Sequence, residues 1–170
     1  MEQNAPAGIL EPSSAARRET ILQLLRTAYW NEIETVMNCV ANSVNPDGVG
    51  AEVVRRALAE GAADGLDHAE RFAARIKELY GKVPGSEEFE AGQRAFQPPS
   101  PSTNIASLLH GAISVKDEAI VLCGRLLEAT QGVDPVTEHL VVEVLRDEQA
   151  SKRRFESFLK EYQGQGIGLA

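Results

Sequence analysis

The chain has 170 residues, enough for one domain with a sizeable core, and 43% hydrophobic with 25% charged residues is an ordinary globular composition. Aromatic residues make up only 5% of the chain, and the abundance of Ala, Leu, Glu and Arg favours helices over sheets. The net charge of −8 opposes binding to a phosphate backbone, and no apolar run is long enough to cross a bilayer, so we expect neither a nucleic-acid nor a membrane partner.

Hydrophobic residues recur at helical spacing in four long segments, which turn and capping residues delimit. The turn sequence Asn45-Pro46-Asp47-Gly48 ends the first segment. Either Ser102 or Thr103 is a suitable N-cap for the third segment. Asp134 followed by Pro135 marks the start of the fourth. The sequence therefore predicts helices near residues 14–42, 51–81, 103–130 and 134–162, with flexible tails at 1–13 and 163–170.

The connections between these predicted helices differ in length. Short turns join the first helix to the second and the third to the fourth, so each pair is expected to form an antiparallel hairpin. Residues 82–101 separate the two hairpins, and a structureless loop of that length is unusual in a compact domain. We expect this segment to cross the bundle from end to end. The predicted fold is all-α, a four-helix bundle over residues 14–162.

Each predicted core stripe is interrupted near its middle by a polar residue. An isolated carboxylate in an apolar core costs several kcal/mol, so a buried one must be paired, protonated or bound to a metal ion. Short turns of similar length place matching positions of antiparallel helices at similar depth. We therefore expect the four interrupting residues to converge in the bundle centre: Glu32, His68, Glu118 and Glu148.

The chain resembles the ferritin-like proteins over roughly residues 18–162, especially small bacterial relatives of bacterioferritin and of the starvation-induced DNA-protection (Dps) proteins. The segments that carry the resemblance are AYWNEIE, DGLDHAERFAARIK, GKVPGSEEF, FQPPSPST, KDEAI and LRDEQASKRRFESFL. The family's di-iron site takes a Glu from each of two helices and a Glu-x-x-His motif from each of the other two. Gly65 and Ser151 stand where a motif glutamate and a motif histidine belong. The resemblance implies that the remaining four ligands are Glu32, His68, Glu118 and Glu148.

The resemblance implies a metal-binding protein, with iron as the first candidate and manganese or zinc compatible with the same ligands. Ferroxidase activity would be weakened, because Gly65 removes a bridging carboxylate. Haem is not expected, since a bacterioferritin-like haem needs a methionine in the second helix and the chain has only Met1 and Met37. A second reading remains open, in which a non-catalytic structural or interaction protein keeps the ferritin-like fold without a physiological metal.

The remaining expectations concern assembly and location. We expect a homo-oligomer, either a dimer or a larger assembly. The first residues lack the pattern of a secretory signal, which favours a cytoplasmic location. Cys39 and Cys123 lie in predicted helices without the spacing of a metal motif, so we expect two reduced thiols in the core.

Overall fold

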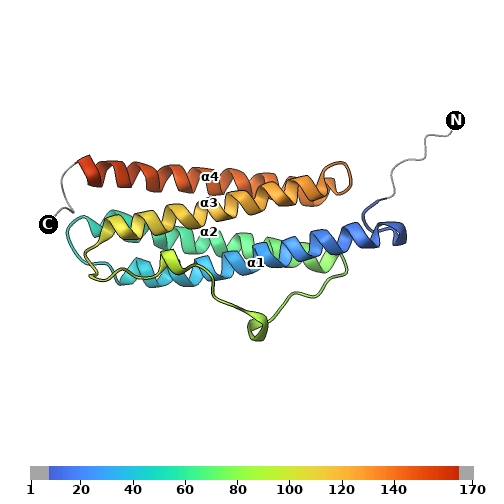
Figure 1. Ribbon diagram of the computed structural model, residues 1–170, viewed down its shortest axis with the longest axis horizontal. Helices are drawn as coiled ribbons and strands as arrows, with labels where there is room; N and C mark the ends of the chain where they lie inside the picture. The colour runs from blue at the N-terminus through green and yellow to red at the C-terminus, as the bar shows by residue number, and fades with distance from the viewer. Residues whose placement is uncertain (1–7, 165–170) are drawn as a thin grey trace.

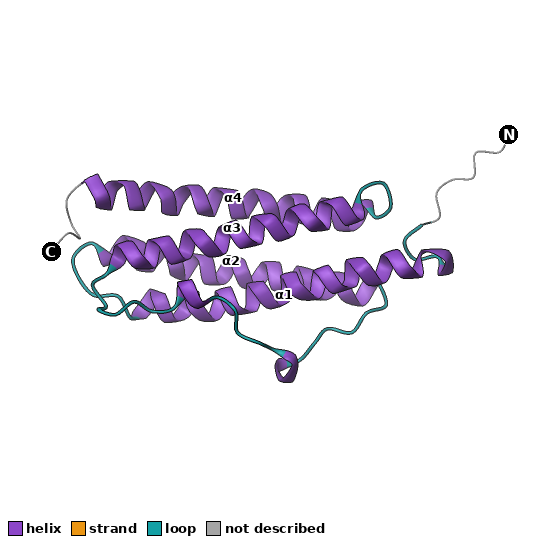
Figure 2. Cartoon of the chain, viewed as in Figure 1, coloured by secondary structure: helices purple, strands orange, loops and turns teal. Residues whose placement is uncertain are grey.

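The computed structural model describes residues 8–164 and contains, within that range, helices and loops but no strand (Figures 1 and 2). The four long helices lie side by side along one axis. Their bounds fall within three residues of those expected from the sequence. Residues 1–7 and 165–170, which make up most of the two predicted tails, lie outside the described part of the chain. The helices are α1 (Ala15–Val44), α2 (Ala51–Glu78), α3 (Ile105–Thr130) and α4 (Pro135–Gly164).

The helices pair as the connection lengths predict. α1 packs against α2, and α3 packs against α4, so the bundle consists of two hairpins. The segment between α2 and α3 leaves one end of the bundle and reaches the other, as Figure 1 shows in green and yellow. It contains two short 3-10 turns, η2 (Ser86–Glu88) and η3 (Arg94–Phe96). The all-helical bundle with a long crossover is therefore confirmed.

The helix ends show why the elements begin where they do. Asn104, rather than Ser102 or Thr103, caps α3, because its side-chain oxygen accepts a hydrogen bond from the Ser107 amide at 3.1 Å. Asp134 caps α4 as expected, with its Oδ1 accepting from the Thr137 amide at 3.1 Å.

A buried polar network anchors the crossover to α1. Both carboxylate oxygens of Glu34 accept from the Gly92 amide at 2.9 Å, and one also accepts from the Gln93 amide at 2.8 Å. The Gln93 side chain donates to Thr35 Oγ1 at 2.7 Å. On the other side, a Cβ at Gly111 of α3 would lie 2.2 Å from the Ala95 carbonyl oxygen, so only glycine permits this approach of η3. The crossover is therefore a fixed part of the bundle.

We expect Glu34→Ala to lower the free energy of unfolding by about 1–3 kcal/mol, because it removes the acceptor of the buried Gln93 amide and of the partly buried Gly92 amide. Chemical denaturation would measure the change. Glu88→Ala is the matched control, since Glu88 is exposed on the same crossover, and should change stability by no more than about 0.5 kcal/mol. Equal effects of the two substitutions would contradict the anchoring role of Glu34.

The core is divided into two apolar clusters by a layer of buried polar side chains, here called the polar layer, which includes Glu32, His68, Lys116 and Glu148. One cluster lies toward the α1 N-terminus and the other toward its C-terminus. Along every helix the break between the clusters falls near the middle. The first cluster includes Ile21, Leu25, Phe72, Ile76, Leu126 and Val144, and the second includes Val54, Leu58, Leu108, Leu109, Val115 and Phe155.

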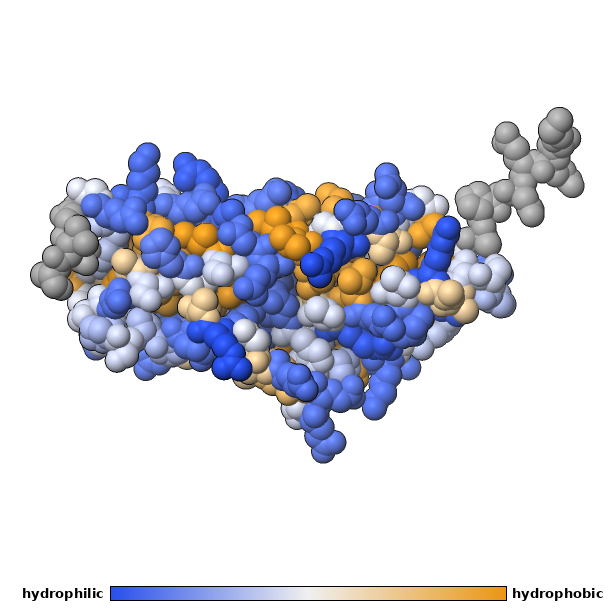
Figure 3. All heavy atoms as spheres, in the orientation of Figure 1, coloured by the Kyte–Doolittle hydropathy of each residue, from blue (hydrophilic) through white to orange (hydrophobic). Residues whose placement is uncertain are grey.

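One face of the bundle is mainly hydrophilic. In the face drawn in Figure 3, hydrophilic side chains cover most of the area and apolar atoms form an interrupted band along the long axis. None of the helices between residues 8 and 164 is long and apolar enough to span a membrane.

Candidate metal centre

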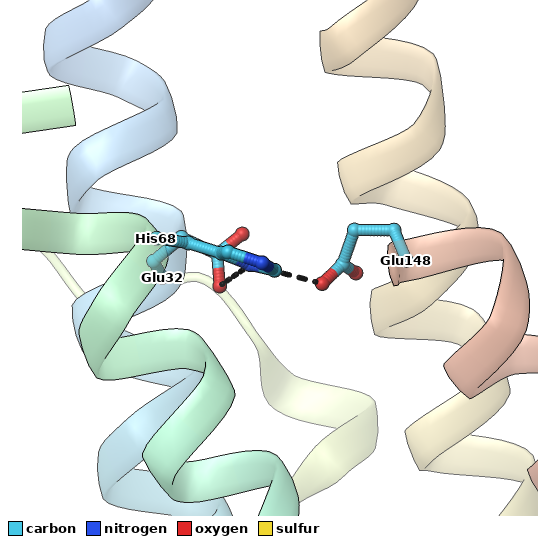
Figure 4. Close-up of side chains that lie close together, drawn as sticks. All are labelled: Glu32, His68 and Glu148. Carbon is cyan, nitrogen blue, oxygen red and sulfur yellow. Dashed lines mark ion pairs between the residues drawn. The ribbon is translucent and has the colours of Figure 1, made fainter. Parts of the chain in front are cut away.

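Three of the four residues predicted to converge meet in the polar layer. Glu32 comes from α1, His68 from α2 and Glu148 from α4, and each is at most 3% exposed. Figure 4 shows the imidazole of His68 between the two carboxylates. His68 Nδ1 lies 3.9 Å from Glu32 Oε2 and 3.5 Å from Glu148 Oε1. One ligand atom from each residue lies within 4.8 Å of the others, a spacing that suits a single metal ion.

Several polar atoms in this cluster have no hydrogen-bond partner. Glu32 Oε2, His68 Nδ1 and Glu148 Oε2 are all buried, and none of them makes a hydrogen bond, although His68 Nδ1 and Glu32 Oε2 lie within ion-pair distance. Leaving such atoms unsatisfied costs about 1–3 kcal/mol each, more when they are charged. The three atoms come from three different helices and belong to one cluster, so a cation bound among them would satisfy all three at once.

The fourth predicted residue, Glu118, lies elsewhere, and its predicted convergence is wrong. Its side chain is exposed and lines a surface cavity of about 430 Å³ together with Thr27 and Asn31 of α1. The reason is helical phase. The buried face of α3 passes through Val115, Lys116 and Ala119, and a residue two positions after Lys116 points about 200° away from it.

Lys116 takes the inward position on α3 that the sequence reading assigned to Glu118. It is only 4% exposed, and its Nζ donates to Glu148 Oε1 at 2.9 Å. The sequence contained a signal for it, since Ala112, Lys116, Ala119 and Cys123 follow helical spacing as well as the stripe through Glu118 does.

The two positions without a ligand differ in their surroundings. A Cβ at Gly65 would lie 3.1 Å from Val36 Cγ2 and 3.4 Å from Glu32 Oε2, so α1 packs closely against this glycine. Ser151 instead lines a cavity of about 370 Å³ between α2 and α4, together with Gly61, Asp64 and Asp147. Space for a side chain therefore exists beside Ser151 but hardly beside Gly65.

Asp147 is another neighbour of the cluster that the sequence reading did not identify. Its Oδ2 lies 3.6 Å from His68 Nε2, on the opposite side of the ring from the glutamates. In the neutral imidazole, an Nε2 proton directed at Asp147 would leave the Nδ1 lone pair facing Glu32 and Glu148. This is the ring orientation that a metal ligand needs, with a carboxylate behind the histidine.

The cluster perturbs the protonation of its own members. Burial raises the pKa of Glu32, although the nearby His68 offsets part of that effect. Burial acts in the same direction on Glu148, but His68 and the Lys116 ammonium outweigh it and lower the pKa of Glu148 below its usual range. Burial would lower the pKa of His68, yet the two glutamates raise it to about 10. With no metal bound, the His68 imidazolium and the Lys116 ammonium therefore face the Glu148 carboxylate.

Cys39 and Cys123 lie on either side of the polar layer, one in each apolar cluster. Both are buried free thiols, as expected. Burial raises the pKa of each to about 12, so both remain protonated at neutral pH. Because the thiolate is the form that binds metals, neither cysteine is assigned to the candidate centre.

The raised pKa of His68 predicts a pH dependence of stability in the absence of metal. Above pH 6.5 the unfolded state loses the His68 proton while the folded state keeps it up to about pH 10, so stability falls as pH rises through this window. Between pH 7 and 8.5 the contribution reaches at most about 1.4 kcal/mol per pH unit. Denaturation in chelator at several pH values should show this slope, and His68→Gln should remove it. An unchanged slope in the variant would contradict the assignment.

A family model and several solved structures are similar to this chain. The family model, described as a ferritin-like domain, matches residues 22–164. The dodecameric thioferritin of Bacteroides fragilis, a bacterioferritin-related protein, is 20% identical with a TM-score of 0.76, over 88% of this chain and 89% of that chain. The bacterioferritin of Desulfovibrio desulfuricans, described with a diiron site, is 20% identical with a TM-score of 0.76, over 89% of this chain and 85% of that chain.

A third solved structure, described as ferritin-like diiron-carboxylate proteins from Bacillus anthracis, is 17% identical with a TM-score of 0.70, over 84% of this chain and 97% of that chain. At these identities the likeness shows the fold alone. The sequences of curated proteins yield no match.

Proposed function

This chain belongs to the ferritin-like domain family, and we propose that it binds one divalent metal ion, with iron as the first candidate, between Glu32, His68 and Glu148. The observation that carries this proposal is a cluster of three buried side chains from three helices, each with a polar atom that has no hydrogen-bond partner. In such a site the protein's own residues bind and orient the ion, and they keep it away from bulk water.

The distances support a single ion. Metal–ligand bonds of about 2.0–2.2 Å place neighbouring ligand atoms about 3–3.5 Å apart. His68 Nδ1 lies 3.5 Å from Glu148 Oε1 and 3.9 Å from Glu32 Oε2, so small side-chain rotations would bring one oxygen of each glutamate to these separations. Two carboxylates with one imidazole suit ferrous iron or manganese, and zinc also accepts them.

We do not extend the proposal to redox turnover. A bound iron would supply one-electron chemistry towards oxygen. The chain lacks the carboxylate at Gly65 and the imidazole at Ser151, and Glu118 is exposed away from the centre. We therefore propose metal binding as the function and assign no catalytic residue.

The proposal predicts a metal-dependent rise in stability. Protein purified without chelators should contain metal by elemental analysis, and anaerobic titration with Fe²⁺ or Mn²⁺ should show one site per chain. Unfolding should become harder by about 2.7 kcal/mol at a hundredfold excess of free metal over the dissociation constant. Glu32→Ala should abolish both effects, because Glu32 provides one of the three ligands.

Glu118→Ala is the matched control, because Glu118 is a glutamate of the same bundle that the structure places outside the centre. It should bind metal like the native chain. Loss of binding in Glu118→Ala with retention in Glu32→Ala would reverse the assignment.

A second function has its own supporting observation. Lys116 already supplies a positive charge to Glu148 inside the core, so the polar layer is able to exist without a metal. The protein would then be a structural or interaction module with the ferritin-like fold. Absence of bound metal and of any metal-induced stabilisation in the native chain would favour this function.

We also propose that the chain forms a homo-oligomer. Met37, Val40 and Val44 follow one face of α1 and are 49%, 54% and 68% exposed, and apolar side chains gathered on one face favour burial between subunits. Sedimentation equilibrium would show a monomer if this is wrong.

Haem is not part of the proposed function, because Met37 on α1 is the only methionine within residues 8–164 and α2 has none. Location in the cytoplasm stays a prediction.

A further inference from the structure

We propose that Lys116 acts as a built-in cation of this centre, so that the centre accepts no more than one divalent ion. The inference rests on the proposed metal-binding function and deepens it. It concerns a residue that no metal-ligand pattern identifies.

The geometry places the ammonium within the cluster. Lys116 extends from α3, the helix that contributes no carboxylate to the centre, because Asp117 and Glu118 are both exposed. Its Nζ lies 2.9 Å from Glu148 Oε1, the same oxygen that faces His68 Nδ1 at 3.5 Å. The other oxygen, Oε2, is buried without a hydrogen bond. One oxygen of Glu148 is thus held by Lys116, and one remains available to an ion.

The charges lead to the same conclusion. A ferritin-like site that holds two ions draws four carboxylates from its helices. Here the buried cluster has two, Glu32 and Glu148, and already contains the Lys116 ammonium. Two divalent ions would add four positive charges to this buried set, and the excess would have no anion to balance it. One divalent ion is the most that these residues can accommodate.

Lys116 also explains how the bundle folds without metal. An internal ammonium neutralises Glu148 in the empty state, whereas a centre built only from carboxylates would repel itself before metal arrives. The same charge lowers the affinity for the ion that does bind. Removing the charge should therefore strengthen metal binding, and replacing it with a carboxylate should raise the capacity of the site.

The test is a titration of the apo protein with Mn²⁺, followed by calorimetry and by electron paramagnetic resonance of the bound ion. The native chain should bind one Mn²⁺ with the signal of an isolated ion. Lys116→Gln should bind one Mn²⁺ at least tenfold more tightly. Lys116→Glu should bind two, with the signal of a coupled pair. The control Lys152→Gln, which breaks the Lys152–Asp117 pair on the surface, should behave like the native chain.

The outcomes separate this inference from the proposed function. One Mn²⁺ in the native chain with unchanged affinity in Lys116→Gln would overturn the role of Lys116 while the proposed function stands. No binding in the native chain with binding in Lys116→Gln would support Lys116 as the internal cation and overturn the proposed function. No binding in either would overturn both. Two ions in the native chain would also overturn the inference, and this measurement does not depend on the folding of any variant.

Discussion

Asp134→Ala is expected to lower the free energy of unfolding by about 3–5 kcal/mol, the usual cost of breaking a buried ion pair by removing one partner. Asp134 is fully buried and accepts from Arg75 Nη2 at 2.8 Å, and Arg75 is only 8% exposed. The same carboxylate caps α4 through the Thr137 amide and also accepts from the Thr137 hydroxyl. The substitution therefore removes both the ion pair that links α2 to the start of α4 and the N-cap of α4.

Glu78 provides the matched control, because it pairs with the same arginine at 2.8 Å but has a side chain that is 59% exposed. Glu78→Ala should cost less than about 1 kcal/mol, as exposed ion pairs usually do. Chemical denaturation of both variants in chelator measures the difference. A loss of similar size in the two variants would mean that burial of the Asp134 pair adds nothing to its strength.

Glu148→Ala is expected to have an effect of similar size on the metal-free protein, about 3–5 kcal/mol, because it leaves the Lys116 ammonium buried without its partner. The same substitution removes the only α4 group that faces His68 Nδ1. Thermal and chemical unfolding in chelator would measure the loss without any contribution from bound metal.

The double variant Lys116→Met with Glu148→Met tests the cause. Replacing both members of a buried pair by apolar side chains of similar volume is often neutral or stabilising, so the double variant should recover most of the stability that Glu148→Ala loses. His68 keeps Glu32 and Asp147 as neighbours in this background. A double variant as unstable as Glu148→Ala would show that packing rather than unpaired charge is responsible.

The sequence by itself determined the helices, their pairing and three of the cluster residues. Helical periodicity and turn residues are local properties, so the breaks at residues 45–48 and 131–134 could be located without tertiary information. The long connection implied a crossover because a twenty-residue loop has to be accounted for in a compact domain. Glu32, His68 and Glu148 were identifiable because each interrupts a run of apolar residues at helical spacing.

Only the tertiary structure decided which residue of α3 enters the buried cluster and how the crossover is attached to α1. Two stripes on α3, one through Glu118 and one through Lys116, fit a period of 3.6 residues about equally well. The choice between them depends on how α3 is rotated against its neighbours, and packing of whole side chains sets that rotation. The contact of Glu34 with residues 92 and 93 joins positions nearly sixty residues apart. No local pattern encodes such a contact, because it forms only when the crossover reaches α1 in the folded bundle.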